Sequence, residues 1–310
     1  MKKFVAILMG MAVLWALPAA AFAQGFLGGN GTPGIGSFPF NWSNGACGAQ
    51  NAAECGLPGT LRLYAGWLDH PNGSVWALQR PDSTGTAAWP LRGLWFGAST
   101  DLSVDGGLGL IISGSVFLPQ RRAGTWIQTP ADNPFDFDIP SYDWWSVDGL
   151  AKYPATGSFA VLAGFRWDHT SIRVDYSDNT SDDYILNAYI PLFGMQICQR
   201  ASSGSLLLRA VGTPWVGGRL KYNFWDRLGY DEFGDFGVSS GDFLEIFADY
   251  SLKFRGDLSL GGFVKWNSLH VKTAERSLSG LNAEPVSWSV NIKSWTIGAS
   301  LSLGFSTPLL

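Results

Sequence analysis

The sequence predicts an all-β fold, an antiparallel transmembrane β-barrel of about ten strands, with eight to twelve as the range. In the last strand-like run, residues 295–305, apolar side chains occupy every second position and only Thr, Ser and Gly lie between them. One face of that strand is therefore apolar and the other polar or small. The chain also begins with an apparent export signal and combines only 15% charged residues with 39 Gly and 15 Trp. These features are typical of strands that face lipid between aromatic girdles in an outer membrane.

The N-terminus has the composition of a secretory signal peptide. Lys2 and Lys3 precede an apolar run over residues 4–17, and Ala21-Phe22-Ala23 has the spacing of a cleavage site, so residues 1–23 are expected to be removed. A retained helical anchor is the alternative, but the run is shorter than the roughly 20 residues that span a bilayer. Of the 21 basic residues, removal takes Lys2 and Lys3 and leaves 19 against 25 acidic residues. This negative balance argues against nucleic acid as a partner.

Residues 24–58 form a Gly- and Pro-rich segment without a regular period, expected to extend into the periplasm or to fold into the barrel lumen. Cys47 and Cys55 lie close together in it, and in an exported protein this spacing predicts a disulfide. No His or further Cys lies near them, so no metal is expected there, and no cofactor is expected for the chain as a whole. Cys198 lies in an apolar run, where a small packing residue is expected.

From residue 59 to residue 305 strand-like runs alternate with two kinds of connection, and residues 306–310 are a tail. Short and long connections alternate, as periplasmic turns and outer loops do in a barrel. The short turns are 105–106, 155–157, 202–204 and 255–257, and the long connections are about 69–90, 119–141, 177–183, 226–241 and 274–285. The expected strands lie near 60–68, 91–104, 106–118, 142–154, 157–176, 183–201, 204–225, 242–255, 257–273 and 286–305.

Several of these strands carry charge on one face only. A charge facing lipid costs about 2–4 kcal/mol near the bilayer midplane, so the charged face is expected to line the lumen. The predicted lumen charges are Asp148, Lys152, Arg166, Arg209, Glu245, Asp249, Lys253 and Lys265. In a narrow barrel they would pair across the interior, as a structural ionic plug or as a path for solute or protons.

The apolar pattern changes phase twice, near residues 168–171 and near Ser294. A β-bulge at each place would return the apolar side chains to one face. A turn at 168–171, with a different strand count, is the alternative at the first place.

The order of strands, turns and loops over most of residues 59–305 resembles that of the omptins, ten-stranded outer-membrane proteases. Omptins carry an Asp-x-Asp pair in the second outer loop and an Asp-x-His pair in the fourth. Here the second loop contains Asp136-Phe137-Asp138 and the fourth contains Asp231-Glu232-Phe233. The resemblance implies the barrel fold and a site at Asp136, Asp138 and Asp231, with Phe233 in the place of the histidine that would act as base.

The three histidines are the remaining candidates for chemistry, and they are His70, His169 and His270. His169 and His270 are expected near the outer rim, where either is a candidate base beside Asp136 or Asp138. Outer-membrane lipid hydrolases and acyltransferases pair His with Ser, and Ser171, Ser240 and Ser268 are available. The three histidines are not expected to form a metal site.

These features predict a barrel located in the outer membrane, with a largely filled lumen and a structural or surface-interaction role, with or without a narrow solute passage. Catalysis is left open and a non-catalytic role is favoured. The alternatives are an omptin-like surface protease and an outer-membrane lipid-modifying hydrolase. The expected partners are outer-membrane lipid, lipopolysaccharide and the barrel-assembly machinery. Residues 296–303 resemble the C-terminal signal that this machinery recognises, although residues 306–310 follow the final aromatic residue, Phe305.

Overall fold

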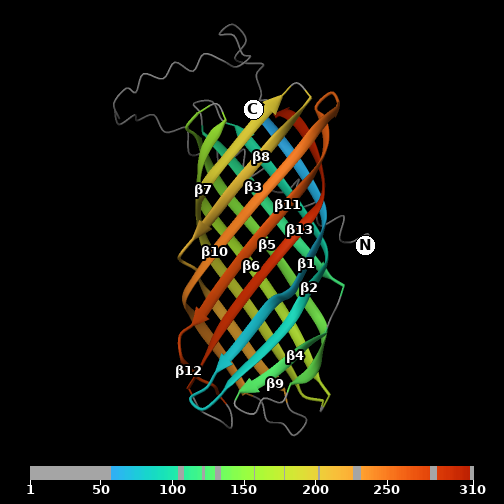
Figure 1. Cartoon of the computed structure of the whole chain (residues 1–310). Helices are drawn as coiled ribbons and strands as arrows, with labels where there is room; N and C mark the ends of the chain where they lie inside the picture. The colour runs from blue at the N-terminus through green and yellow to red at the C-terminus, as the bar shows by residue number, and fades with distance from the viewer. Residues whose placement is uncertain are drawn as a thin grey trace, which may run out of the picture. The chain divides into compact units, whose positions relative to one another are not determined.

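The computed structural model describes residues 57–103, 108–120, 123–129, 134–156, 158–177, 179–201, 203–225, 232–279 and 285–307. These residues form an antiparallel β-barrel (Figure 1), which confirms the predicted fold class. In this part of the chain no helix has the length and apolarity that a membrane-crossing helix needs. The predicted signal peptide, the cysteine pair Cys47 and Cys55, and Asp231 lie outside the described residues.

The barrel wall is a closed ring of about ten strand positions. Its strands are β1 (Leu57–Gln79), β2 (Thr84–Ser103), β3 (Gly109–Pro119), β4 (Ala123–Thr129), β5 (Phe135–Pro154), β6 (Phe159–Tyr176), β7 (Ser181–Ala201), β8 (Gly204–Thr213), β9 (Gly217–Trp225), β10 (Glu232–Arg255), β11 (Leu258–Thr273), β12 (Arg276–Ser277) and β13 (Pro285–Thr307). β3 and β4 share one position between β2 and β5, and β8 and β9 share one between β7 and β10. β1 pairs with both β2 and β13, so the ring closes and leaves no strand edge in lipid.

The barrel has two halves that differ in their side chains. We call the end that carries β4, β9 and β12 the outer half, which includes residues 232–242 of β10 and 285–293 of β13 (Figure 1). The membrane half includes residues 244–254 of β10 and 295–305 of β13. Its strands join through tight turns such as the one at Gly256, which has a φ of 57°. Short turns mark the periplasmic end of such barrels.

Three of the long connections predicted from the sequence are wrong, because strands occupy them. β1 and β2 together extend over most of 69–90, and β4 and the first part of β5 lie within 119–141. The first part of β10 lies within 226–241. These segments are polar because the outer half stands in water, where an outward-facing strand position takes the same residues as a loop.

The predicted bulge or turn at residues 168–171 is also wrong. β6 pairs with β7 in constant register from Phe159 to Asp175. Its even-numbered side chains point inward throughout, and they change from Arg166 and Asp168 to Ile172 and Val174. The phase of the apolar pattern therefore changes because the surroundings change. In the membrane half the apolar residues of β6 face mainly outward, and in the outer half they face the interior.

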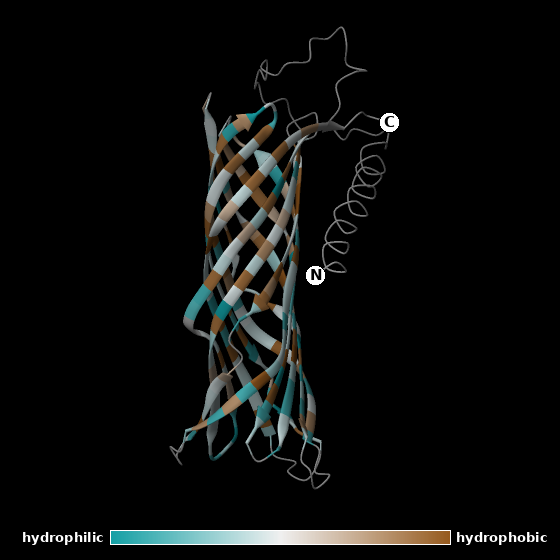
Figure 2. Ribbon diagram, turned by 90° about the vertical axis from the view of Figure 1, so that its right-hand side faces the viewer, coloured by the Kyte–Doolittle hydropathy of each residue, from teal (hydrophilic) through white to brown (hydrophobic). Residues whose placement is uncertain are grey.

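β13 shows the same change at Ser294 without a bulge of its own. Its buried side chains alternate from Val286 to Ser302, and its register with β11 is constant. Near Ser294 the register does shift in the neighbouring strand β1, whose pairing with β13 and β2 is irregular between Asp69 and Ser74. Figure 2 shows the alternation of polar and apolar residues along the strands.

The outward face of the membrane half is an apolar belt. Its exposed members include Leu63, Trp67, Leu94, Val161, Phe165, Phe193, Met195, Leu244, Ile246, Leu252, Leu260, Val264, Ile297, Leu301 and Leu303. Trp145 packs against Trp167 with 4.8 Å between ring centroids, and Trp266 lies 6.1 Å from Trp295. A belt with clustered tryptophans is the lipid-facing surface of a transmembrane barrel.

The interior of the outer half is an aromatic core. Trp76 of β1 and Trp288 of β13 are at most 1% exposed. Both pack against Tyr184 of β7, with ring centroids 5.2 Å and 5.3 Å away, and Trp288 also packs against Tyr222 of β9 at 5.1 Å. Trp89 of β2 stacks on Trp76 at 6.0 Å. Because these rings come from strands on different sides of the ring, they fill the lumen of the outer half.

The seam between β1 and β13 gives a test of ring closure. A Cβ at Gly298 of β13 would lie 2.2 Å from the carbonyl oxygen of Ala65 and 2.4 Å from the Cα of Gly66. We predict that Gly298→Val lowers the yield of the folded, heat-modifiable form by about tenfold, because overpacking costs about 1–3 kcal/mol. Gly262→Val is the control, since a Cβ there would meet only the Gly298 carbonyl oxygen, at 3.4 Å. Equal folded yields of the two variants on unheated gels would contradict this account of the seam.

Candidate functional site

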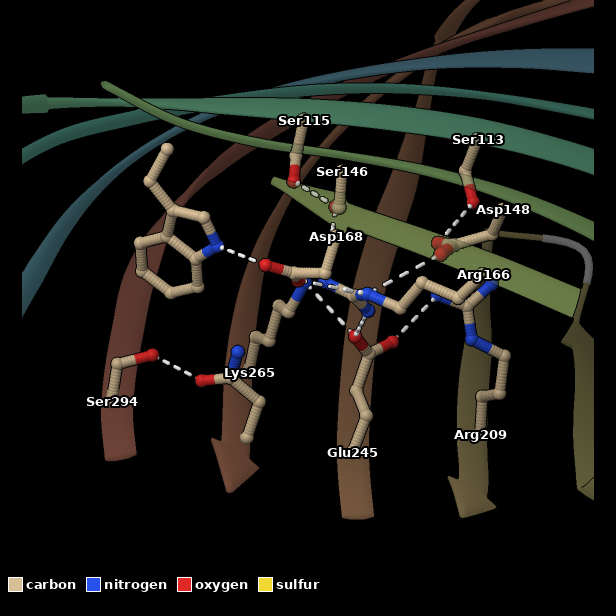
Figure 3. Close-up of polar contacts among 12 residues, drawn as sticks. Ser113, Ser115, Ser146, Asp148, Arg166, Asp168, Arg209, Glu245, Lys265 and Ser294 are labelled. Atoms are coloured by element: carbon tan, nitrogen blue, oxygen red, sulfur yellow. Dashed lines mark hydrogen bonds and ion pairs between the residues drawn. The ribbon is translucent and has the colours of Figure 1, made fainter. Parts of the chain in front are cut away.

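The lumen of the membrane half contains an ion-pair network centred on Arg166 and Glu245 (Figure 3). The Arg166 side chain is 1% exposed and donates hydrogen bonds to Glu245 at 2.9 Å and to Asp168 at 3.2 Å. Asp148 lies 3.6 Å from the same guanidinium. The network thereby links β5 and β6 to β10.

Two further cations reach the same carboxylate of Glu245. Arg209 of β8 donates to one of its oxygens and Lys265 of β11 lies beside the other, each at 3.0 Å. Aromatic faces cover the cations: Arg209 lies 5.3 Å from the Phe247 ring centroid and Lys265 lies 4.9 Å from that of Trp95. Charges buried this deeply are tolerated only when they are paired and hydrogen-bonded.

The other predicted lumen charges lie nearer the periplasmic end. Asp249 accepts a hydrogen bond from Ser300 at 2.6 Å and lies 3.9 Å from Arg62. Lys152 pairs with Asp101, and Lys253 is exposed. The sequence prediction omitted Arg62, Asp101 and Asp168, although Arg62 and Asp101 alternate with apolar residues as inward positions do.

The space left inside the network is small. A cavity of about 30 Å³ lies between Tyr64, Trp95, Asp148, Arg209 and Lys265, among other residues. The network is therefore an ionic plug of the membrane half.

A groove of about 830 Å³ lies in the outer half, between β2, β4, β5 and β6. Its lining includes the aromatic side chains Trp89, Phe137 and Tyr176, the carboxylates Asp136, Asp138 and Asp175, and Arg92. Asp138 stands opposite Asp175 in the register of β5 and β6. Thr125 donates a hydrogen bond to Asp136 at 3.1 Å, and Arg92 is paired with Asp69 at 2.9 Å. The groove is therefore acidic, and among its aromatic side chains Tyr176 is partly exposed while Trp89 and Phe137 are buried.

Asp136 and Asp138, the candidates from the omptin resemblance, lie in this groove, but the lining residues include no histidine. His169 lies on the outward face instead, stacked on Trp145 with 5.0 Å between ring centroids, and its Nδ1 is 2.8 Å from Oδ1 of Asn187. His70 lies in β1 next to the change of register. The structure thus does not bring either of these histidines to the groove.

His270 is the histidine that meets both a carboxylate and a serine. Its Nδ1 lies 3.2 Å from Oδ2 of Asp242 on β10, and its Nε2 lies 3.5 Å from Oγ of Ser289 on β13. Ser171, Ser240 and Ser268, the serines considered in the sequence, make no such contact among the described residues. Ser289 was missed because it reaches His270 only through the pairing of β11 with β13.

No metal site is formed by the described residues, since no group of three or more His, Cys, Asp or Glu side chains converges there. Cys198 is a free thiol, half-buried and packed against the apolar core. Its surroundings are those of a packing residue.

A further polar cluster of the outer half is built around Asp182 of β7. Tyr176, Tyr184 and Tyr222 donate hydrogen bonds to its carboxylate at 2.5 Å, 2.7 Å and 3.0 Å. Burial raises the pKa of Asp182 to about 6, and the three hydroxyl donors oppose that rise. The cluster ties β6, β7 and β9 together inside the aromatic core.

No protein-family model and no curated relative matches the sequence. Among solved structures, the chain is similar to the outer membrane protease OmpT from Escherichia coli, with a TM-score of 0.60 and 10% sequence identity over 80% of this chain and 97% of that one. The chain therefore has the fold of an outer-membrane β-barrel, with omptin-like topology. At 10% identity the likeness shows the fold alone.

Two other barrels give much lower TM-scores. The outer membrane protein OprG from Pseudomonas aeruginosa gives 0.35, with 11% identity over 82% of this chain and 98% of that one. The attachment invasion locus protein Ail of Yersinia pestis, solved with the heparin analogue sucrose octasulfate, gives 0.27, with 9% identity over 80% and 99% of the two chains. Likeness at this level supports no argument about the omptin-like barrel described here.

Asp182 makes the stability of the outer half depend on pH. Its pKa is about 6 in the folded barrel and 3.8 in an unstructured chain, so the folded state must bury a charge at pH above 6. We predict that wild type gains about 2–3 kcal/mol relative to Asp182→Asn as the pH falls from 8 to 4, because protonation removes that cost. Urea unfolding in lipid vesicles at both pH values measures this. The expectation fails if the difference between the two proteins is the same at pH 8 and pH 4.

Proposed function

We propose that the protein is a closed outer-membrane barrel with a surface-interaction role. The observation that supports this most strongly is that side chains fill both halves of the lumen. The network of Arg166 and Glu245 occupies the membrane half, and the rings of Trp76, Tyr184 and Trp288 occupy the outer half. A barrel filled in this way offers its function at its surface.

The groove between β2, β4, β5 and β6 is the surface that we assign to binding. Its carboxylates Asp136, Asp138 and Asp175 attract cations, and the partly exposed ring of Tyr176 favours the apolar stems of Lys and Arg side chains. Arg92 is already paired with Asp69 and offsets little of this charge. A basic peptide is therefore the ligand class that fits the groove. Outer-membrane lipid and lipopolysaccharide are expected to contact the outward belt.

An omptin-like surface protease is the second candidate. It is favoured by the shared fold and by the position of Asp136 and Asp138 in the groove. A water-activating pair also needs a base beside those carboxylates, and the histidines of the described residues lie elsewhere. We therefore expect the groove to bind a basic peptide without cleaving it.

Conductance tests the closed lumen. We predict that the purified barrel in planar bilayers shows conductance far below that of a general porin. The double variant Arg166→Ala, Glu245→Ala removes the centre of the ionic plug, but its conductance should stay low because the aromatic core still closes the outer half. Stable conductance of porin size in wild type would refute the closed-lumen proposal.

Peptide binding tests the groove. We predict that the double variant Asp136→Asn, Asp138→Asn weakens binding of an Arg- and Lys-rich peptide by roughly 5- to 30-fold, the effect of about 1–2 kcal/mol, with the largest loss at low salt. Asp143→Asn is the matched control, because Asp143 is exposed on the same strand and does not line the groove. Equal affinity of all three proteins would contradict the binding role. Peptide cleavage that needs Asp136 or Asp138 would favour the protease.

A further inference from the structure

Three polar side chains lie in a row across β10, β11 and β13 on the outward face of the barrel. Asp242 is the direct register partner of His270, and Ser289 lies two residues along β13 from Asn291, the other direct partner of His270. The neighbouring Phe243, Leu269 and Val290 are buried inside the barrel. Because side chains alternate between the two faces of a strand, the row points out of the barrel.

The contacts within the row follow the order carboxylate, imidazole, hydroxyl. Asp242 Oδ2 lies 3.2 Å from Nδ1 of His270, and Ser289 Oγ lies 3.5 Å from Nε2. With the Nδ1 proton donated to Asp242, the lone pair of Nε2 faces the serine hydroxyl, the arrangement in which a histidine acts as base toward a serine. Such contacts are often loose without substrate and tighten when it binds. The His270 side chain is 33% exposed, so a ligand can reach it.

The row lies beside the lipid-facing belt, on the side of the outer half. On β10 the next outward side chains from Asp242 toward the belt are Leu244 and Ile246, which are 41% and 49% exposed. On β11 Trp266 precedes His270 by four positions, roughly 13 Å along the strand, and it packs against Trp295. Tryptophan girdles mark the boundary between acyl chains and headgroups. The row therefore lies on the headgroup side of the Trp266–Trp295 pair, and a lipid ester must move from that boundary toward the outer half to meet it.

Two lysines stand beside the row. Lys272 is the register partner of Ser289, and Lys293 lies two residues beyond Asn291 on β13, and both are exposed. Ammonium groups at headgroup level attract lipid phosphates. The surroundings of the row therefore suit an anionic lipid.

We propose that Ser289, His270 and Asp242 form a hydrolase site for an acyl ester of a membrane lipid. Ser289 Oγ attacks the ester carbonyl carbon while His270 Nε2 takes the hydroxyl proton. The carbon–oxygen bond to the alcohol then breaks, and His270 returns the proton to the departing alkoxide. Water attacks the acyl-serine with the same histidine as base, which releases a fatty acid and restores Ser289. Asp242 positions the His270 ring.

The purified full-length barrel tests the proposal with two lipids and one covalent probe. Phospholipid vesicles and lipopolysaccharide are offered separately, and released fatty acid is measured, so the two arms identify the lipid that carries the ester. A fluorophosphonate reports an activated serine, and peptide mass spectrometry locates it. We expect release from at least one lipid and labelling of Ser289. Ser289→Ala should abolish both, and His270→Gln should lower both by about 100-fold or more.

The role of Asp242 is tested by a measurement that separates the positioning of the His270 ring from an effect on the stability of the barrel. We expect Asp242→Asn to lower kcat by about tenfold or more with an altered pH profile, and Asp242→Glu to restore part of it. Ser268→Ala is the matched control, because Ser268 is two residues from His270 on the same outward face of β11. All variants must show the heat-modifiable form. No release from either lipid together with no labelling of Ser289 in folded wild type would overturn the proposal, as would full activity of Ser289→Ala.

Discussion

Lipid tolerates neither an unpaired backbone group nor a charge on the outer surface of a barrel, and the architecture depends on this constraint. It requires the seam between β1 and β13, where Gly298 lets the two backbones approach closely. It also assigns side chains to faces, since Leu244 and Ile246 can stand outward only because Glu245 turns inward. Ten strand positions then leave an interior that side chains can fill.

The same constraint explains why the two halves are filled differently. In the membrane half the outward positions are mostly apolar, and the interior combines apolar residues such as Phe263 with polar ones. Those polar groups must then satisfy one another, as Arg166 does with Glu245 and Asp168. In the outer half water surrounds the wall, so the interior can bury rings such as Trp76 and Trp288 as a soluble protein does. The change takes place within single strands, without a bulge in β6 or β13.

Alternation over residues 295–305 and in β10 carries enough information to predict the barrel, because a period of two is a property of one strand. The alternation of apolar residues fails as a guide where the environment changes from lipid to water. From the sequence, β4, the outer part of β1 and the first part of β10 are predicted as loops, because a strand facing water and a loop carry the same polar residues. The contact of His270 with Ser289 depends on the register between β11 and β13, and shifting that register by one residue would turn Ser289 inward. Register comes from pairing over the whole ring, which no local pattern contains.

A filled lumen restricts where the barrel can act. Ligands in water reach the groove of the outer half, where Asp138 and Asp175 face each other across β5 and β6. Lipids reach the wall from the side. On the outward face of the wall a polar side chain is tolerated only where the apolar belt ends, toward the outer half. Asp242, His270 and Ser289 lie on the headgroup side of the belt, where the water that hydrolysis consumes can reach them. A serine nucleophile placed in the row of Ile246, Trp266 and Trp295, two steps of the alternation farther into the belt than His270, would stand among apolar side chains, without water and without a partner for its proton.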